Sequence, residues 1–212
     1  SLLRMKISVL EKTMSANEWD NIDFSKIPSK AGLRYRNAFA TREETKERYA
    51  EFAKSNSTKV NAGTLYPYEV VYNALRCVSC PIADPERKMI NKYWENLPDY
   101  FDGKESNMLC VVDTSGSMIG YDASAPINVA ISLGIYAAER AGGPFKNHYI
   151  SFSSRPSLVE VRGLDITDKA KRIYNSCIID NTDLTAVFDL LLAIADRSDT
   201  REEDIPKSIV VI

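Results

Sequence analysis

An uninterrupted apolar run, Met108 to Val112, ends in Asp113 and has the length of one β-strand. The run has no polar residue at alternate positions, so both faces of the strand must be covered, as in a parallel sheet between helices. The chain has 212 residues, of which 44% are apolar and 26% are charged, which is a globular composition. This length suits one large domain or two small ones. We therefore expect a packed α/β core around this strand.

Residues 107–212 alternate between strand-like and helix-like segments in the order of an open α/β sheet. The expected strands cover 108–112, 148–153, 157–161 and 208–212, and the expected helices cover 127–141, 167–175 and 184–197. Ligands of such sheets bind at the carboxyl ends of the parallel strands. Asp113 and the residues after it are therefore the first candidates for a site.

Residues 1–103 lack strand-like alternation, and their apolar residues recur at helical spacing. The expected helix starts are the capping-box pattern from Thr41 to Glu44, the first-turn residue Pro67, and Asp84-Pro85. We expect a small all-helical module of roughly four to six helices, joined to the α/β part by residues 98–103.

Charge and hydropathy exclude two classes for the chain as a whole. A formal net charge of −2 argues against a uniformly basic, polyanion-binding protein. No apolar run approaches the roughly 18 residues that span a bilayer, and charges interrupt the apolar start of the chain, unlike a signal peptide. We expect a cytoplasmic protein with no membrane partner. Because the sequence stops within the apolar run 208–212, we also expect it to be a fragment.

Four cysteines raise the question of a zinc or redox site. Cys77 and Cys80 form one Cys-x-x-Cys pair, but Cys110 and Cys177 lie singly in apolar runs, so no second pair completes a tetrahedral zinc site. The residues before Cys77 look helical, whereas a thioredoxin-like motif follows a strand. We expect the pair to be structural or incidental, and the other two thiols to be buried.

A carboxylate and two hydroxyls follow the first expected strand at alternate positions, namely Asp113, Ser115 and Ser117. Alternate residues of an extended loop point to the same side, so the three side chains can converge. Oxygen ligands of this kind suit a hard divalent cation such as Mg²⁺, which accepts a partial protein shell completed by water.

Other chemistries fit these residues less well. An aspartic protease needs Asp-Thr-Gly or Asp-Ser-Gly, which Ser115 interrupts, and residues 116–120 have the wrong spacing for the Gly-x-Ser-x-Gly of a hydrolase. The single histidine, His148, falls in an expected strand, where a structural role is more common than a place in a Ser-His-Asp triad. We assign no catalytic residue and expect no enzymatic activity.

The segment from Cys110 to Met118 resembles the Asp-x-Ser-x-Ser core of the metal-ion-dependent adhesion site of von Willebrand factor A domains. The resemblance implies that residues 107–212 form a Rossmann-like domain, a parallel sheet with one antiparallel edge strand between helices. It also implies a threonine ligand before a later helix, for which Thr182 is the choice and Thr185 the nearby competitor. The family's last ligand is an aspartate after the fourth strand, and we expect the chain to be truncated before it.

In the resembling family the metal, Mg²⁺ or alternatively Mn²⁺ or Ca²⁺, accepts a carboxylate from a protein partner. The resemblance therefore implies a metal-dependent binding module that engages an acidic group, with weak or absent metal binding in the truncated chain. A metal-dependent hydrolase is the weaker alternative, because one acidic ligand and no general base support it poorly.

The helical half adds a second alternative. Residues 26–59 hold nine Lys or Arg against four Glu, and the candidates for phosphate contact are Lys30, Arg34, Arg36 and Arg48. The interleaved aromatics Tyr35, Phe39, Tyr49 and Phe52 could stack on unpaired bases, although their helical spacing favours a core.

A helical module before an A domain resembles the Ro autoantigen family, in which helical repeats bind RNA. The segments IDFSKIPSKAGLRYRNAF and NAGTLYPYEVV resemble, more closely, bacterial and viral Ro-like A-domain proteins with a longer helical part. The alternative function is therefore binding of a small or single-stranded RNA by the basic helical module.

Overall fold

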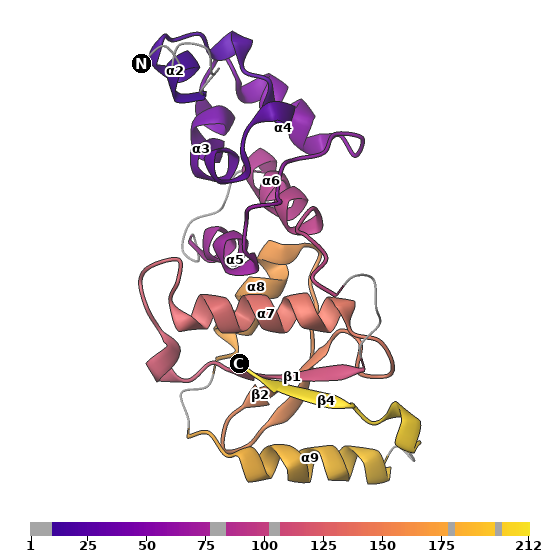
Figure 1. Ribbon diagram of the computed structural model, residues 1–212. Helices are drawn as coiled ribbons and strands as arrows, with labels where there is room; N and C mark the ends of the chain where they lie inside the picture. Colours follow the sequence, from indigo (N-terminus) through magenta and orange to yellow (C-terminus); the bar gives the residue numbers. More distant parts are fainter. Residues whose placement is uncertain (1–9, 77–83, 102–106, 178–180, 198–200) are drawn as a thin grey trace. The chain divides into compact units, whose positions relative to one another are not determined.

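The computed structural model describes residues 10–76, 84–101, 107–177, 181–197 and 201–212. The chain divides into two compact units, each described by itself (Figure 1). The helical unit comprises residues 1–66 and 79–98, and the sheet unit comprises residues 67–78 and 99–212. Cys77 and Cys80 lie outside the described residues.

The sheet unit is built on four strands in the order β3-β2-β1-β4. The strands are β1 (Met108–Asp113), β2 (His148–Phe152), β3 (Ser157–Glu160) and β4 (Ser208–Val211). Strand β1 is parallel to both β2 and β4, whereas β2 and β3 are antiparallel. The expected mixed α/β architecture, with mostly parallel strands and one antiparallel pair, is confirmed.

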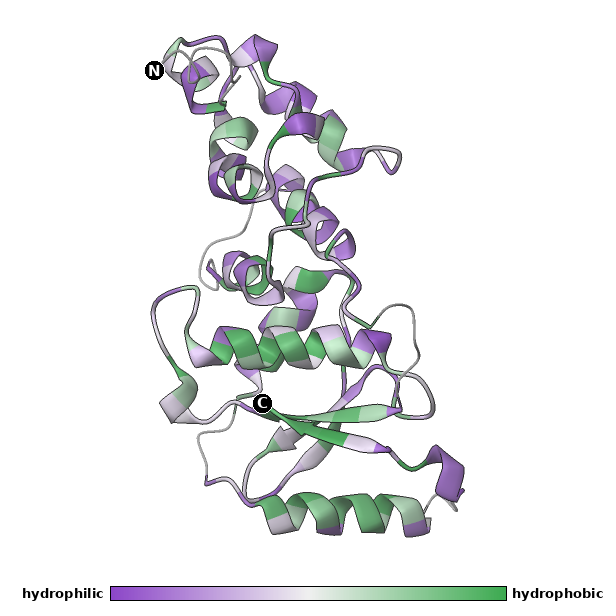
Figure 2. Ribbon diagram, viewed as in Figure 1, coloured by the Kyte–Doolittle hydropathy of each residue, from purple (hydrophilic) through white to green (hydrophobic). Residues whose placement is uncertain are grey.

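Helices cover both faces of this sheet (Figure 1). Helix α7 (Pro126–Arg140) lies on one face and α9 (Leu184–Arg197) on the other. Figure 2 shows that β1, β4, α7 and α9 are largely hydrophobic, as a sheet buried between helices requires. The inward side of α9 places Val187 in a core with residues of β1 and β2, while its outward side leaves Leu184, Phe188 and Leu192 exposed.

Two further helices, α5 (Pro67–Leu75) and α8 (Ile166–Asn175), pack with α7. Helix α5 falls within residues 1–103, the expected helical module, but in the structure it belongs to the sheet unit. Helix α5 belongs there because its apolar side packs against α7 and α8, where Val70, Val71 and Ala74 are fully buried. The two units therefore do not divide at a single point along the chain.

The helical unit contains α2 (Leu10–Ser15), α3 (Ser29–Thr41), α4 (Lys46–Lys54) and α6 (Asp84–Glu95), with short 3₁₀ turns at Trp19–Asn21 and Phe24–Lys26. Helices α3, α4 and α6 pack against one another. Their core is aromatic: the ring of Phe39 contacts those of Trp19, Phe24 and Tyr49 at centroid distances of 5.5–6.3 Å. The contacts of Phe39 with Trp19 and Phe24 are edge-to-face, and that with Tyr49 is tilted.

One expected helix start is wrong. Thr41 is the last residue of α3 and its hydroxyl donates a hydrogen bond to the carbonyl of Asn37, whereas α4 begins at Lys46, after Thr45. A threonine hydroxyl that bonds the carbonyl four residues earlier is not free to cap a following helix. The starts at Pro67 and Asp84 are confirmed.

Two ionisable side chains in the sheet core are expected to make the free energy of unfolding depend on pH in the alkaline range. Cys110 and Tyr149 are register partners on β1 and β2, and burial raises the pKa of Cys110 from 9.0 to about 11 and that of Tyr149 from 10.0 to about 12. The unfolded chain loses these protons at lower pH than the folded chain does. The stabilisation is therefore fully present below pH 9 and is lost as pH rises toward 12.

We expect the free energy of unfolding to fall by up to about 1.4 kcal/mol per pH unit for each group inside its window. Urea unfolding of the wild type and of Cys110→Ala at pH 8, 9, 10 and 11 measures this dependence. The variant is less stable at pH 8 because it lacks a buried side chain, but its stability declines less between pH 9 and 11. An equal decline in both proteins would contradict the assignment to Cys110.

Candidate metal centre

Asp113 occupies the middle of the sheet's carboxyl edge. It is the last residue of β1, an inner strand, and its register partner on β2 is Phe152. On the other side its backbone N–H donates to the carbonyl of Ile212 at 2.9 Å, directly after β4. Asp113 therefore lies where three parallel strands end, and it is half-buried.

The loop after β1 brings the two predicted serines together. The Ser115 and Ser117 hydroxyl oxygens lie 3.0 Å apart, and the Ser115 backbone N–H donates to Oδ1 of Asp113 at 2.8 Å. The loop is not extended as expected, because the segment Gly116–Met118 forms a 3₁₀ turn, η3. This turn places the serine side chains on the same side, so the predicted convergence of Ser115 and Ser117 arises by a different local geometry.

The donor set fits a hard, octahedral cation. The Ser115 and Ser117 hydroxyls form a hydrogen bond of 3.0 Å with each other, and this separation is also that of two neighbouring ligands of an octahedral Mg²⁺, each about 2.1 Å from the cation. All three candidate atoms are oxygens, as Mg²⁺ and Mn²⁺ prefer. Within the described residues no group of three His, Cys, Asp or Glu side chains is placed to hold a metal ion. The candidate ligands here are one carboxylate, that of Asp113, and the neutral hydroxyls of Ser115 and Ser117.

The predicted threonine ligand lies on the connection between α8 and α9. Burial raises the pKa of the Cys177 thiol, just after α8, and a hydrogen bond with the side chain of Thr114 opposes that rise. The connection therefore starts beside the loop that carries Asp113. Helix α9 begins on the side of the sheet where β4 ends (Figure 1).

Thr182 and Thr185 are both exposed at the start of α9. Between them, Asp183 caps this helix, because its Oδ1 accepts hydrogen bonds from the N–H groups of Thr185 at 2.9 Å and Ala186 at 3.2 Å. The choice of Thr182 over Thr185 as a ligand stays a prediction.

His148 is not assembled with these hydroxyls. It lies at the amino end of β2, whereas Asp113 pairs with Phe152 at the carboxyl end of the same strand. The Nδ1 atom of His148 forms a hydrogen bond of 2.8 Å with the carbonyl of Lys146. The imidazole therefore bonds to the backbone just before β2, and it lies at the opposite end of the strand from Ser115 and Ser117.

The predicted RNA contacts of the helical unit divide into buried and exposed residues. Arg36 is buried, with Nε 2.8 Å from Oε1 of Glu86 and Nη1 donating to the carbonyl of Leu33 at 2.7 Å. The prediction that Arg36 contacts RNA does not fit this position, since its guanidinium is held in the core. Lys30 and Arg34 are exposed.

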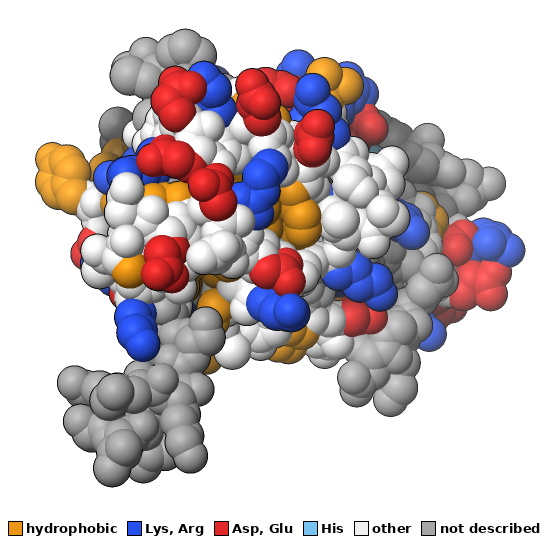
Figure 3. Space-filling model, turned by 90° about the horizontal axis from the view of Figure 1, so that it is seen from above, with side chains coloured by type: hydrophobic (Ala, Val, Ile, Leu, Met, Phe, Trp, Pro, Cys, Tyr) orange, Lys and Arg blue, Asp and Glu red, His pale blue; other side chains and the backbone are white. Residues whose placement is uncertain are grey.

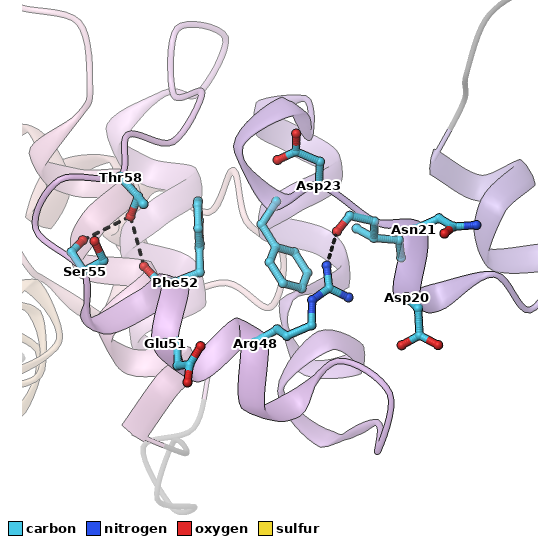
Figure 4. Close-up of a pocket in the computed structure, with 10 residues that line it drawn as sticks. Asp20, Asn21, Asp23, Arg48, Glu51, Phe52, Ser55 and Thr58 are labelled. Atoms are coloured by element: carbon cyan, nitrogen blue, oxygen red, sulfur yellow. Dashed lines mark hydrogen bonds between the residues drawn. The ribbon is translucent and has the colours of Figure 1, made fainter.

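Arg48 is exposed but engaged in its own unit. It donates to the carbonyl of Ile22 at 2.6 Å and lies over the ring of Phe24. It lines a groove of about 570 Å³ whose rim is acidic, as Figure 4 shows with Asp20, Asp23 and Glu51 around the guanidinium. A polyanion meets the carboxylates of Asp20 and Glu51 there, so this groove is unfavourable for a phosphate backbone.

A second groove of the helical unit, of about 810 Å³, is lined by Lys26, Lys30 and Arg34 but also by Glu11 and Asp23. Lys26 and Asp23 form an ion pair of 3.1 Å. Figure 3 shows acidic and basic side chains interspersed on the face seen from above, with no continuous basic patch. Of the interleaved aromatics, whose helical spacing favours a core over base stacking, Phe39 and Tyr49 are fully buried. RNA binding through the remaining exposed residues stays a prediction.

The family model DUF2828, a domain of unknown function, matches residues 1–107, and DUF7788, also a domain of unknown function, matches residues 107–212. An uncharacterized protein of Acanthamoeba polyphaga mimivirus is 31% identical over 207 residues. The match covers 90% of this chain and 34% of the viral protein, so the chain spans about a third of that relative's length.

No solved structure matches the chain. The boundary between the two family models, at residue 107, falls directly before β1. None of the helices in the described part of the chain is both long and apolar enough to cross a membrane.

Proposed function

Because the chain belongs to the DUF2828 and DUF7788 families, whose descriptions name no activity, we propose its function from its own site. Residues 107–212 act as a divalent-metal-dependent binding module, resembling a von Willebrand A domain, that engages an acidic group of a protein partner. One observation carries this proposal: the two serine hydroxyls, hydrogen-bonded to each other at 3.0 Å, lie beside Asp113, whose Oδ1 accepts from the Ser115 N–H at 2.8 Å, at the end of an inner parallel strand.

The charge of the donor set explains why such a site binds a carboxylate. Asp113, Ser115 and Ser117 together supply one negative charge to a doubly charged cation, because serine hydroxyls are neutral ligands. The metal keeps a net positive charge and exchangeable water positions, so an Asp or Glu side chain of another protein is a favourable further ligand. Binding of this kind makes and breaks no covalent bond.

The surroundings support binding more than hydrolysis. Asp183, the acidic residue next to Thr182, accepts two backbone hydrogen bonds as the cap of α9. His148 lies at the other end of β2 and hydrogen-bonds a backbone carbonyl. A metal-dependent hydrolase needs a base or a second charged ligand that activates water, and neither of these groups is arranged for that role.

The proposal predicts one Mn²⁺ or Mg²⁺ site per chain and a dependence on Ser117. Ser117 is exposed and its hydroxyl contacts only that of Ser115 among the hydrogen bonds of this loop, so Ser117→Ala removes a ligand without disturbing the fold. We expect the variant to bind Mn²⁺ roughly tenfold more weakly by isothermal titration calorimetry, the lower end of the range for altered metal environments.

The matched control is Ser124→Ala, which removes a hydroxyl from the same loop, one that donates to Asp122 and not to the site. We expect it to bind Mn²⁺ as the wild type does. Saturable binding that is equal in the wild type and Ser117→Ala, or the absence of saturable binding by the wild type at millimolar Mn²⁺, would overturn the proposal.

A further inference from the structure

The connection between α6 and β1 is attached to α7. It is described as far as residue 101, and residues 98–101 belong to no helix or strand. The boundary between the two units falls within it, directly after Pro98. Beyond this boundary, the N–H of Tyr100 donates to the hydroxyl oxygen of Tyr136, a residue of α7, at 3.0 Å. The chain is therefore held where it enters the sheet unit.

Aromatic rings meet at this contact. The ring centroids of Tyr100 and Phe101 lie 5.8 Å and 5.9 Å from that of Tyr136, and the Phe101 ring is inclined to it by 22°. The guanidinium of Arg140, one turn later in α7, lies over the Tyr136 ring at 3.7 Å from its centroid. With these neighbours in place Tyr136 is 3% exposed. Residues 99–101, here called the strap, thus help to cover a large aromatic side chain.

The end of α7 that receives the strap is fixed by α8. Glu139 accepts a hydrogen bond of 2.6 Å from Nζ of Lys169, a residue of α8, and both side chains are more than three-quarters buried. Helix α7 also packs against β1 and α5. Tyr136 therefore stands on a part of the sheet unit that keeps its place whether or not the strap is attached.

The strap is closed on itself by a local hydrogen bond. The N–H of Phe101 donates to Oδ1 of Asp99 at 3.0 Å, so an aspartate side chain takes the place of a backbone partner in the turn. Tyr100 is 55% exposed and Phe101 is half-buried. Segments with much exposed surface and no strand or helix hydrogen bonds open at a lower free-energy cost than core strands do. The strap can therefore leave α7 while the sheet core stays folded.

We infer that residues 99–101 form a strap that closes on Tyr136 and opens independently of the sheet core. Opening releases these residues, or about 10 Å of extended chain, into the connection between α6 and β1. It also uncovers the ring of Tyr136. The strap is thus a conformational device that sets the length of chain available to this connection, and it does not depend on the proposed metal site.

Hydrogen exchange of the isotope-labelled full chain, followed by NMR, tests the inference at the Tyr100 amide. In the wild type we expect this amide to exchange faster than that of Asp113, which donates to Ile212 within the sheet. Tyr136→Phe keeps the ring but removes the oxygen that accepts from the Tyr100 N–H. We expect the variant to exchange the Tyr100 amide about fivefold faster, because one hydrogen bond is lost, and the Asp113 amide at an unchanged rate.

The matched control is Tyr174→Phe, which removes the hydroxyl of a half-buried tyrosine in α8. We expect its Tyr100 amide to exchange as in the wild type. Equal exchange of the Tyr100 amide in the wild type and Tyr136→Phe would show that Tyr136 does not hold the strap. Parallel acceleration of the Tyr100 and Asp113 amides would show that the strap opens only when the sheet unit unfolds. Either result overturns the inference.

Discussion

Replacing Arg36 with methionine is expected to lower the free energy of unfolding of the helical unit by about 3–5 kcal/mol. The guanidinium and the carboxylate of Glu86 are each more than nine-tenths buried and lie 2.8 Å apart. Methionine fills a similar volume but leaves the Glu86 charge buried without its partner. It also removes the donor of the 2.7 Å hydrogen bond to the carbonyl of Leu33.

Tryptophan fluorescence during urea unfolding measures this loss for the helical unit alone, because the two tryptophans, Trp19 and Trp94, both belong to it. The matched control is Arg34→Met, on the same helix but exposed, and we expect it to change stability by less than about 0.5 kcal/mol. The double variant Arg36→Met/Glu86→Leu should recover much of the lost stability, because both charges are removed. Equal stability of the two single variants would show that the buried ion pair does not stabilise the unit.

The burial of Arg36 could have been predicted from the residue spacing in α3. Gly32, Leu33, Arg36 and Phe39 recur at helical spacing and are all buried, so Arg36 lies on the inward face. The number of basic residues between 26 and 59, on which the RNA prediction was based, does not show which of them face the core. The partner, Glu86, lies 50 residues later in the sequence, and no local pattern connects the two. Long-range pairing of charges is the kind of contact that a single sequence does not reveal.

The elements of the sheet unit were predictable almost to the residue because their boundaries are chemically sharp. The apolar run that ends in Asp113 is β1, and the helix expected over 127–141 is α7, Pro126–Arg140. The grouping of α5 with the sheet unit was not predictable from the sequence. An amphipathic pattern shows that a helix has an apolar face, but it does not show which element covers that face.

The candidate site was also predictable in part, because its residues follow the sharp end of β1. Asp113 follows a buried strand, and its two serines are near in sequence, so their proximity depends on local geometry alone. The exposure of Ile119 and Tyr121 was not predictable, because apolar residues in a loop between a strand and a helix are more often covered than exposed. Only the folded loop, held by Asn128, shows that they remain in solvent.

The largest expected effect on the proposed metal site is that of Asp113→Asn. Asparagine has the shape of aspartate and keeps an oxygen that can accept the 2.8 Å hydrogen bond from the Ser115 N–H, while the Asp113 backbone N–H still bonds Ile212. The loop is therefore retained, and the only loss is the negative charge. Since even the loss of an outer interaction weakens metal binding about 10–100-fold, removing the one charged ligand should weaken it by more than roughly a hundredfold.

Calorimetric titration with Mn²⁺ checks this expectation, and circular dichroism of the same samples checks that the fold is retained. The matched control is Asp122→Asn, which neutralises an exposed carboxylate of the same loop, one that accepts a hydrogen bond from Ser124. If the effect were one of general loop charge, both variants would lose affinity to a similar degree. Loss confined to Asp113→Asn assigns the cation to the end of β1, whereas unchanged Mn²⁺ binding by this variant would place the metal elsewhere in the chain.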